Sequence, residues 1–335
     1  MRLEELRGAV SRYSAAAVME RGGTSALVVE RGARLLGLFV RGVNLLWVNP
    51  ELESVLERGQ WNVGGLRLWV SPERSFFYED PERFAGWFCP GSLDPGSYRI
   101  TAAGPARVVL EGVVEATDRT TGHRLHAKVR REFRLVAEDR LIVRDAVLAS
   151  YRGDFNLWAL AQVEPGARGA AVVPVRRGAQ PVHYFGPIPP DRLVVSGDHV
   201  SFRIDGRGVY KLGVRPEDLP LEGAAAIAHV AEREGGLWTL LLMRTFDAPR
   251  WQEECLDVAK ADPAGPRGCV QSYNSGPEAG PEVFGEIELH FRPAAEVAGR
   301  RVSTVEYELV FDVGPRERVL ERLRAETGIG ELRLP

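Results

Sequence analysis

Short segments in which apolar and polar residues alternate recur along most of the chain, and this period-two pattern constrains the fold more than any other feature. The clearest are HRLHAKVRREFRLV (123–136), EIELHF (286–291) and TVEYELVFDVG (304–314). Successive side chains of a strand point to opposite faces, so the alternation predicts strands with one buried face. Because few helical segments separate these strands, we expect an all-β sandwich of antiparallel strands.

Turn signals divide several of these segments. Residues 32–50 predict two short strands around Arg41-Gly42, and residues 106–129 predict a strand, a turn at Thr121-Gly122 and a second strand. Asp205-Gly206 lies between two alternating runs, so residues 199–214 predict a β-hairpin.

Helical patterns are confined to the two ends of the chain. Residues 2–13 predict one short helix, and residues 315–328 predict another that starts at a proline and stops at a glycine. We expect a single domain over 1–335, with a core of about 25–314 and a terminal helix of about 315–327. Sandwiches of more than 200 residues commonly form one unit.

Composition excludes several classes of function. The net charge is −3 with acids and bases interspersed, so no nucleic acid partner is expected. The three cysteines are far apart, and the chain contains no phosphate-binding loop or zinc motif. We expect no metal and no cofactor, with Ca²⁺ left open. The start of the chain lacks an apolar signal segment and no run of 18 apolar residues occurs, so we expect a cytoplasmic protein without a membrane partner. The oligomeric state is left open.

The stretch from Trp61 to Tyr98 is the most unusual part of the sequence. It holds nine aromatic residues, a double glycine, and the charged residues Arg67, Glu73 and Arg74 close to Trp69. Aromatic rings beside hydrogen-bonding charges suit a sugar, whose C–H face packs on a ring while its hydroxyls bond to polar groups. The alternative is an irregular segment that covers one end of a sheet.

Other candidates lie on later segments. Glu286, Glu288 and His290 share one face of a strand and could act as acid and base, or simply form its solvated face. Gln271 and Asn274 end a strand before a Gly/Pro-rich loop, where sites are common. His183 could shuttle a proton or pack against loop backbone. Lys211 either faces solvent or faces inward, where it would need an anionic partner.

Three segments resemble the aldose-1-epimerase-like proteins of the galactose-mutarotase-like superfamily. They are GARLLGLFVRGVNLLWVNP, NVGGLRLWVSPE and FGEIELHFRPAAEVAGRRVSTVEYELVF, and the likeness runs from about residue 25 to 314. The pattern is closest to an uncharacterised branch. The resemblance implies a β-supersandwich with short N- and C-terminal helices and a carbohydrate cleft across one sheet.

The resemblance also implies a mechanism, in which a carboxylate deprotonates the anomeric hydroxyl of a sugar and a histidine protonates its ring oxygen. The matching positions here carry Gln162 and Gln271, and an amide does not exchange protons usefully at neutral pH. His183 with Glu286 or Glu288 could take the two roles from displaced positions, and Arg67 matches a sugar-binding arginine.

We therefore expect a protein that recognises a small carbohydrate, with an aldose 1-epimerase-type isomerase as the first candidate activity. The alternatives are a non-catalytic sugar-binding or regulatory module, and a lyase or hydrolase that acts on uronate-type sugars. The residues expected in the pocket are Arg67, Trp69, Glu73, Arg74, Gln162, Lys211, Gln271, Asn274 and Glu286.

Overall fold

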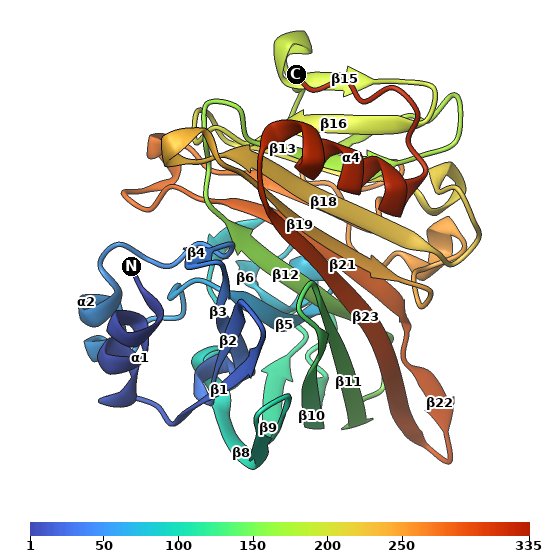
Figure 1. The fold of residues 1–335 in the computed structure, drawn as a ribbon. Helices are drawn as coiled ribbons and strands as arrows, with labels where there is room; N and C mark the ends of the chain where they lie inside the picture. Colours follow the sequence, from blue (N-terminus) through green and yellow to red (C-terminus); the bar gives the residue numbers. More distant parts are fainter.

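Two large antiparallel sheets packed face to face make up most of the computed structural model, which describes residues 1–335 (Figure 1). The first sheet runs in the order β1-β2-β3-β5-β12-β21-β20-β17-β14, with β4 paired to β3. Its strands are β1 (Ala16–Arg21), β2 (Thr24–Val29), β3 (Arg34–Val40), β4 (Val43–Asn44), β5 (Leu66–Ser71), β12 (Asn156–Val163), β14 (Val182–His183), β17 (Tyr210–Val214), β20 (Val270–Asn274) and β21 (Gly285–Pro293).

The second sheet runs in the order β15-β16-β13-β18-β19-β23-β11-β10-β9-β8, with β22 paired to β23. Its strands are β8 (Ser97–Gly104), β9 (Arg107–Thr117), β10 (Arg124–Ala137), β11 (Arg140–Ser150), β13 (Ala170–Pro174), β15 (Leu193–Val195), β16 (His199–Arg203), β18 (Ala225–Glu232), β19 (Trp238–Thr245), β22 (Ala295–Val297) and β23 (Arg300–Gly314). A separate hairpin joins β6 (Tyr78–Asp80) to β7 (Ala85–Trp87).

Helices are few and short. The α-helices are α1 (Leu3–Ser11), α2 (Leu52–Glu57), α3 (Glu73–Phe76) and α4 (Arg316–Thr327). The remaining helical turns are η1 (Arg31–Ala33), η2 (Ser92–Gly96), η3 (Pro190–Arg192), η4 (Pro216–Asp218), η5 (Glu234–Gly236), η6 (Gln252–Glu254) and η7 (Pro277–Ala279). The predicted terminal helices are thus confirmed, and Gly328 ends α4 in the left-handed conformation. None of these helices has the length and apolar character needed to cross a membrane.

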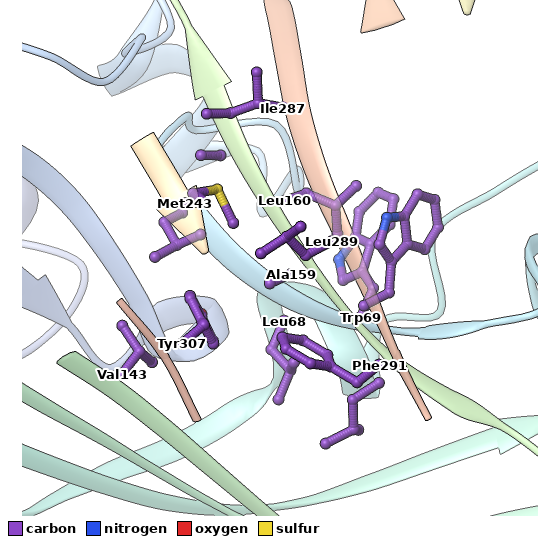
Figure 2. Close-up of a cluster of buried hydrophobic side chains, with 14 of the residues drawn as sticks. Leu68, Trp69, Val143, Ala159, Leu160, Met243, Ile287, Leu289, Phe291 and Tyr307 are labelled. Atoms are coloured by element: carbon purple, nitrogen blue, oxygen red, sulfur yellow. The ribbon is translucent and has the colours of Figure 1, made fainter. Parts of the chain in front are cut away.

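The core lies between the two sheets. One cluster of 65 buried residues contains side chains from both, and Figure 2 shows part of it. Leu68, Ala159 and Leu289 come from the first sheet, whereas Met243 and Tyr307 come from the second. The all-β sandwich expected from the period-two pattern is confirmed. That the whole chain is one domain remains a proposal, which this shared core supports.

The outer faces of the sheets are covered in different ways. Helix α4 lies across the outer face of the second sheet, where Val319 and Leu323 pack against strand residues such as Leu240 (Figure 1). Helices α1 and α2 cover one end of the first sheet. The middle strands of that sheet carry the polar and aromatic side chains described below.

The predicted hairpin over 199–214 is wrong. Strand β16 pairs with β13 and β15 in the second sheet, while β17 pairs with β14 and β20 in the first. Asp205-Gly206 does turn the chain, because the Asn274 side chain accepts hydrogen bonds from both backbone N–H groups. Both sheets bury one face in the same core, so alternation alone could not tell which sheet each strand joins.

Candidate functional site

A cavity of about 360 Å³ opens on the outer face of the first sheet. Its aromatic lining residues come from several strands and loops: Trp61, Trp69, Tyr78, Trp87, Trp158, Phe185, Tyr273 and Phe284. Its charged lining residues are Arg67, Glu73, Lys211, Glu282 and Glu286. Aromatic walls with a few charged groups are typical of ligand-binding cavities.

Strand alternation and register bring the floor of this cavity together. Every second residue of β5, β12 and β21 points away from the core, and the register of these strands puts Trp69, Trp158 and Glu286 on the same outer face. Trp158 lies directly opposite Trp69 on β5, and Glu286 lies opposite Tyr273 on β20. Lys211 on β17 lies opposite Tyr273 in turn. Segments far apart in sequence thus converge on one patch.

The aromatic stretch 61–98 forms one wall of the cavity. Seven lining residues belong to it: Trp61, Asn62, Arg67, Trp69, Glu73, Tyr78 and Trp87. The double glycine positions this wall, because Gly64 and Gly65 have φ of 102° and 82°. A Cβ atom at Gly64 would collide with the Trp47 carbonyl oxygen. Only glycine permits this close passage of the two backbone segments.

Arg67 occupies the centre of the floor. Its Nη2 donates to Glu286 Oε1 at 2.5 Å, and both side chains are almost fully buried. The guanidinium carbon lies 4.1 Å from the ring centroid of Trp69 and 5.2 Å from that of Trp61. Two of its donors, Nε and Nη1, have no hydrogen-bond partner. Arg67 is therefore held by Glu286 and two tryptophan rings, with two buried donors left unpaired.

Lys211 forms the second charged centre. Its Nζ lies 3.2 Å from Glu288 Oε2 and 4.0 Å from Glu73 Oε2. Trp158 Nε1 also donates to Glu288 Oε2, at 3.0 Å. Burial alone would lower the pKa of Lys211, but the neighbouring carboxylates outweigh burial and raise it. Of the two orientations considered for Lys211, the structure has the inward one, since the residue is only 4% exposed.

Glu288 and Glu73 hold their protons more tightly than ordinary carboxyl groups. Burial raises the pKa of Glu288 to about 7; Glu286 and Glu73 act in the same direction and Lys211 opposes them. Burial also raises the pKa of Glu73, with Lys211 opposing and Asp257 adding to the rise. Glu73 Oε1 accepts a hydrogen bond of 2.9 Å from Trp87 Nε1. Glu288 can therefore exchange a proton near neutral pH, and the raised pKa of Glu73 favours its protonated form relative to an ordinary carboxyl group.

The solvated-face interpretation of the EIELH strand is wrong. Glu286, Glu288 and His290 are 7%, 0% and 1% exposed because the aromatic wall covers this face of the sheet. His290 stacks on Trp158 with 4.9 Å between ring centroids. Burial and then Lys211 lower its pKa well below the usual value, and neither ring nitrogen has a partner. His290 is thus a neutral ring behind the cavity wall.

The remaining predicted residues do not line the cavity. Gln162 donates to Asn62 Oδ1, and Gln271 donates to Tyr184 Oη and Asp257. Asn274 holds the turn after β16, as described above. Arg74 donates to the Pro81 carbonyl and pairs with Glu82.

His183 borders a different and smaller pocket, and its Nδ1 accepts a hydrogen bond from the Ile188 backbone N–H. Burial lowers its pKa. The structure therefore does not bring His183 together with the acidic residues of the larger cavity.

Several lining residues were not singled out from the sequence. Trp158 lies four residues before Gln162 on β12 and therefore on the same face, so strand parity could have found it. Asn62 and Glu282 carried no comparable signal, because the loops that contain them have no regular period. No group of three or more His, Cys, Asp or Glu side chains is arranged to hold a metal ion.

Comparison with known proteins places this architecture. Residues 143–290 match a family of unknown function (DUF6786), and no curated protein matches the chain in sequence. A candidate aldose 1-epimerase from Escherichia coli K12 superposes with a TM-score of 0.54 at 13% identity, covering 89% of this chain and 99% of that one. The chain has the galactose-mutarotase-like fold.

Two further solved structures extend this comparison. The Slr1438 protein from Synechocystis sp. PCC 6803 superposes on this chain with a TM-score of 0.52 at 10% identity. The match covers 90% of this chain and 96% of the Slr1438 chain. Galactose 1-epimerase from Lactobacillus acidophilus NCFM gives 0.47 at 12% identity, with 90% and 99% covered. The two superpositions with TM-scores above 0.5 show the fold alone, because the identities are 13% and 10%.

Proposed function

We propose that the cavity on the outer face of the first sheet binds a small carbohydrate. The observation that carries this proposal is the lining, in which charged side chains held in ion pairs lie among eight aromatic rings. The apolar face of a sugar ring packs on aromatic rings, while its hydroxyl groups need fixed donors and acceptors. A volume of about 360 Å³ is close to the lower end of ligand cavities, which suits a monosaccharide.

Arg67 would contact the ligand directly. Its unpaired Nε and Nη1 groups are buried, and a buried donor without a partner is costly. A hydroxyl oxygen entering the cavity would satisfy one of them. Trp87 is 39% exposed and lies at the mouth, where it can close over a bound ring.

The activity that fits these groups is isomerisation at the anomeric carbon. Glu286 would take the proton of the anomeric hydroxyl as the bond between the anomeric carbon and the ring oxygen breaks. Glu73, whose pKa is raised by burial, would give a proton to that ring oxygen. After rotation of the aldehyde the reverse steps close the ring on the other face. We propose Glu73 for the acid role because His183 borders a separate pocket.

A non-catalytic sugar-binding protein is the second candidate. The observation that favours it is the hydrogen bonding of Gln162 and Gln271, which both donate amide protons to fixed neighbours and offer no titratable group. A lyase or hydrolase for uronates is less favoured, because Arg67 and Lys211 already face carboxylates.

Exchange spectroscopy by NMR tests this proposal. The exchange rate between α and β anomers is measured for glucose, galactose, glucosamine and glucuronate, with and without the protein. We expect at least one sugar to interconvert faster than in buffer, and Glu286→Gln to slow that exchange about 100-fold or more. Trp251→Ala, remote from the cavity, is the control. Binding without faster exchange would favour the second candidate, and the absence of binding would contradict the proposal.

A further inference from the structure

Glu282 differs from the other carboxylates of the cavity because no cationic side chain is paired with it. Glu286 faces Arg67, and Glu73 faces Lys211. Glu282 instead accepts hydrogen bonds from two neutral amides, 2.8 Å from Asn49 Nδ2 and 2.5 Å from Asn62 Nδ2. Its side chain lines the cavity and is partly exposed to it.

A relay of amides fixes the orientation of this carboxylate. Gln162 Nε2 donates to Asn62 Oδ1 at 2.8 Å, so the amide group of Asn62 must present its N–H₂ side to Glu282. Asn49 is anchored in turn, because its Nδ2 also donates to the Asn62 carbonyl. Asn49 and Asn62 are 0% and 5% exposed. The chain thus holds one carboxylate rigidly at the cavity wall without neutralising it.

The charged groups of the lining leave one carboxylate without a cation. Glu286 lies against Arg67 and Glu73 lies against Lys211, whereas Glu282 has no cationic partner. Behind the lining residues, Glu288 contacts Lys211. Buried Asp257 accepts a hydrogen bond from the Glu73 backbone N–H and has no ion-pair partner. A lining carboxylate without a cationic partner attracts a cationic ligand and repels an anionic one.

Aromatic rings provide a second attraction for a positive charge. The ring centroids of Trp61 and Trp87 are 5.3 Å apart, and both rings line the same cavity as Glu282. Ammonium groups bind favourably against the faces of tryptophan rings. Arg67 already stacks in this way on Trp61 and Trp69, whereas Trp87 has no cation over its ring.

We infer that the cavity selects sugars that carry a protonated amine, and that Glu282 is the residue that recognises the ammonium group. This inference rests on the proposed carbohydrate site and adds the class of sugar to it. The amine would bond to Glu282 and face the ring of Trp87, while the ring hydroxyls contact Arg67 and Glu286.

Calorimetric titration with matched pairs of sugars tests the inference. Glucosamine and galactosamine carry a positively charged amine. No positive charge is present on their N-acetyl forms, on glucose and galactose, or on glucuronate. We expect at least one amino sugar to bind about 10-fold or more tightly than its N-acetyl form and its parent hexose. Equal or tighter binding of a neutral sugar or of glucuronate would overturn the inference but leave the carbohydrate site intact. If no sugar binds, both proposals fail.

Two variants assign the effect to one residue. Glu282→Gln removes the charge and keeps one of the two oxygens that accept from Asn49 and Asn62, so the preference for the amino sugar should fall to within about twofold. Glu278→Gln is the matched control, because Glu278 lies in the same loop, is exposed and does not line the cavity. A preference that survives in Glu282→Gln, or disappears equally in both variants, would overturn the role given to Glu282.

Discussion

Arg67 on β5 and Glu286 on β21 form a buried ion pair of 2.5 Å across the intervening strand β12. The pair ties together three strands of the sheet that carries the cavity. In the register of that sheet, Arg67 lies opposite Leu160 and Glu286 lies opposite Gln162. The pair therefore crosses β12 between these two residues, and each partner depends on the other to avoid an isolated buried charge.

Removing Arg67 alone should destabilise the protein strongly. Arg67→Met leaves Glu286 buried without its cation, and we expect a loss of about 3–5 kcal/mol in the free energy of unfolding. Denaturation in urea measures it. The exposed pair Arg134–Glu306 is the control, and Arg134→Met should cost less than about 1 kcal/mol. Similar small losses in both variants would show that the buried pair contributes little.

The pKa of Glu288 predicts how stability changes with pH. The pKa is about 7 in the folded protein and 4.5 for the free side chain, so the folded state binds more protons between these values. This contribution is fully present below pH 4.5 and is lost as pH rises through 7. His290, with a lowered pKa, opposes this trend below its ordinary value of 6.5.

Comparison with Glu288→Gln isolates the Glu288 contribution. The variant cannot titrate at this position, so its stability relative to the natural protein should rise by about 2–3 kcal/mol between pH 4.5 and 8. Urea denaturation at several pH values measures the difference. A stability difference that stays constant over this pH range would contradict the raised pKa of Glu288.

The double glycine gives a prediction about the backbone. Gly64→Ala should destabilise the protein by about 1–3 kcal/mol, because the residue has a φ of 102° and its Cβ would meet the Trp47 carbonyl. Gly8 lies inside α1 with open space around it, so Gly8→Ala should stabilise by about 0.5–1 kcal/mol. Thermal denaturation compares the stabilities of the two variants. If Gly64→Ala were as stable as the natural protein, the backbone passage at Gly64 would tolerate a side chain.

Patterns within one segment of the sequence predict local structure well, whereas strand pairing is not predicted. Alternation in segments such as 123–136 depends on one strand alone, and the resulting strands were predicted correctly. The sequence displays the glycine pair at 64–65, but the Trp47 carbonyl that Gly64 passes is set by the fold. The burial of Lys211 and Glu288 depends instead on which strands become neighbours in the sheet. The failed hairpin at 199–214 has the same cause, because strand pairing is set by long-range packing.

The candidate site was predictable to a similar extent. Arg67, Trp69, Glu73, Lys211 and Glu286 were selected as site residues by their chemistry, and all of them line the cavity. Glu282 was missed because its position depends on an amide relay that joins three separate segments. Such a relay leaves no periodic pattern in any one of them.

Trp87 offers a test of ligand binding that does not disturb the core. Its ring is 39% exposed but donates a hydrogen bond to Glu73 and lies against Trp61, so Trp87→Ala should cost the free protein about 1–2 kcal/mol and leave it folded. Loss of its stacking should weaken sugar binding about 10-fold. Trp251→Ala removes a more exposed ring, at 54%, that does not line the cavity, and it should leave affinity unchanged. Equal effects of the two variants on affinity would place the ligand elsewhere.

The central claim, that this cavity binds a sugar, is tested most directly by thermal shift against amino, neutral and acidic monosaccharides. A sugar at about 100 times its Kd should add roughly 2.7 kcal/mol of stability. At this chain length we expect a rise in Tm of about 2 °C or more. The rise should be present in the natural protein and reduced in Trp87→Ala at the same sugar concentration. No rise with any sugar, or an equal rise in both proteins, would contradict the claim.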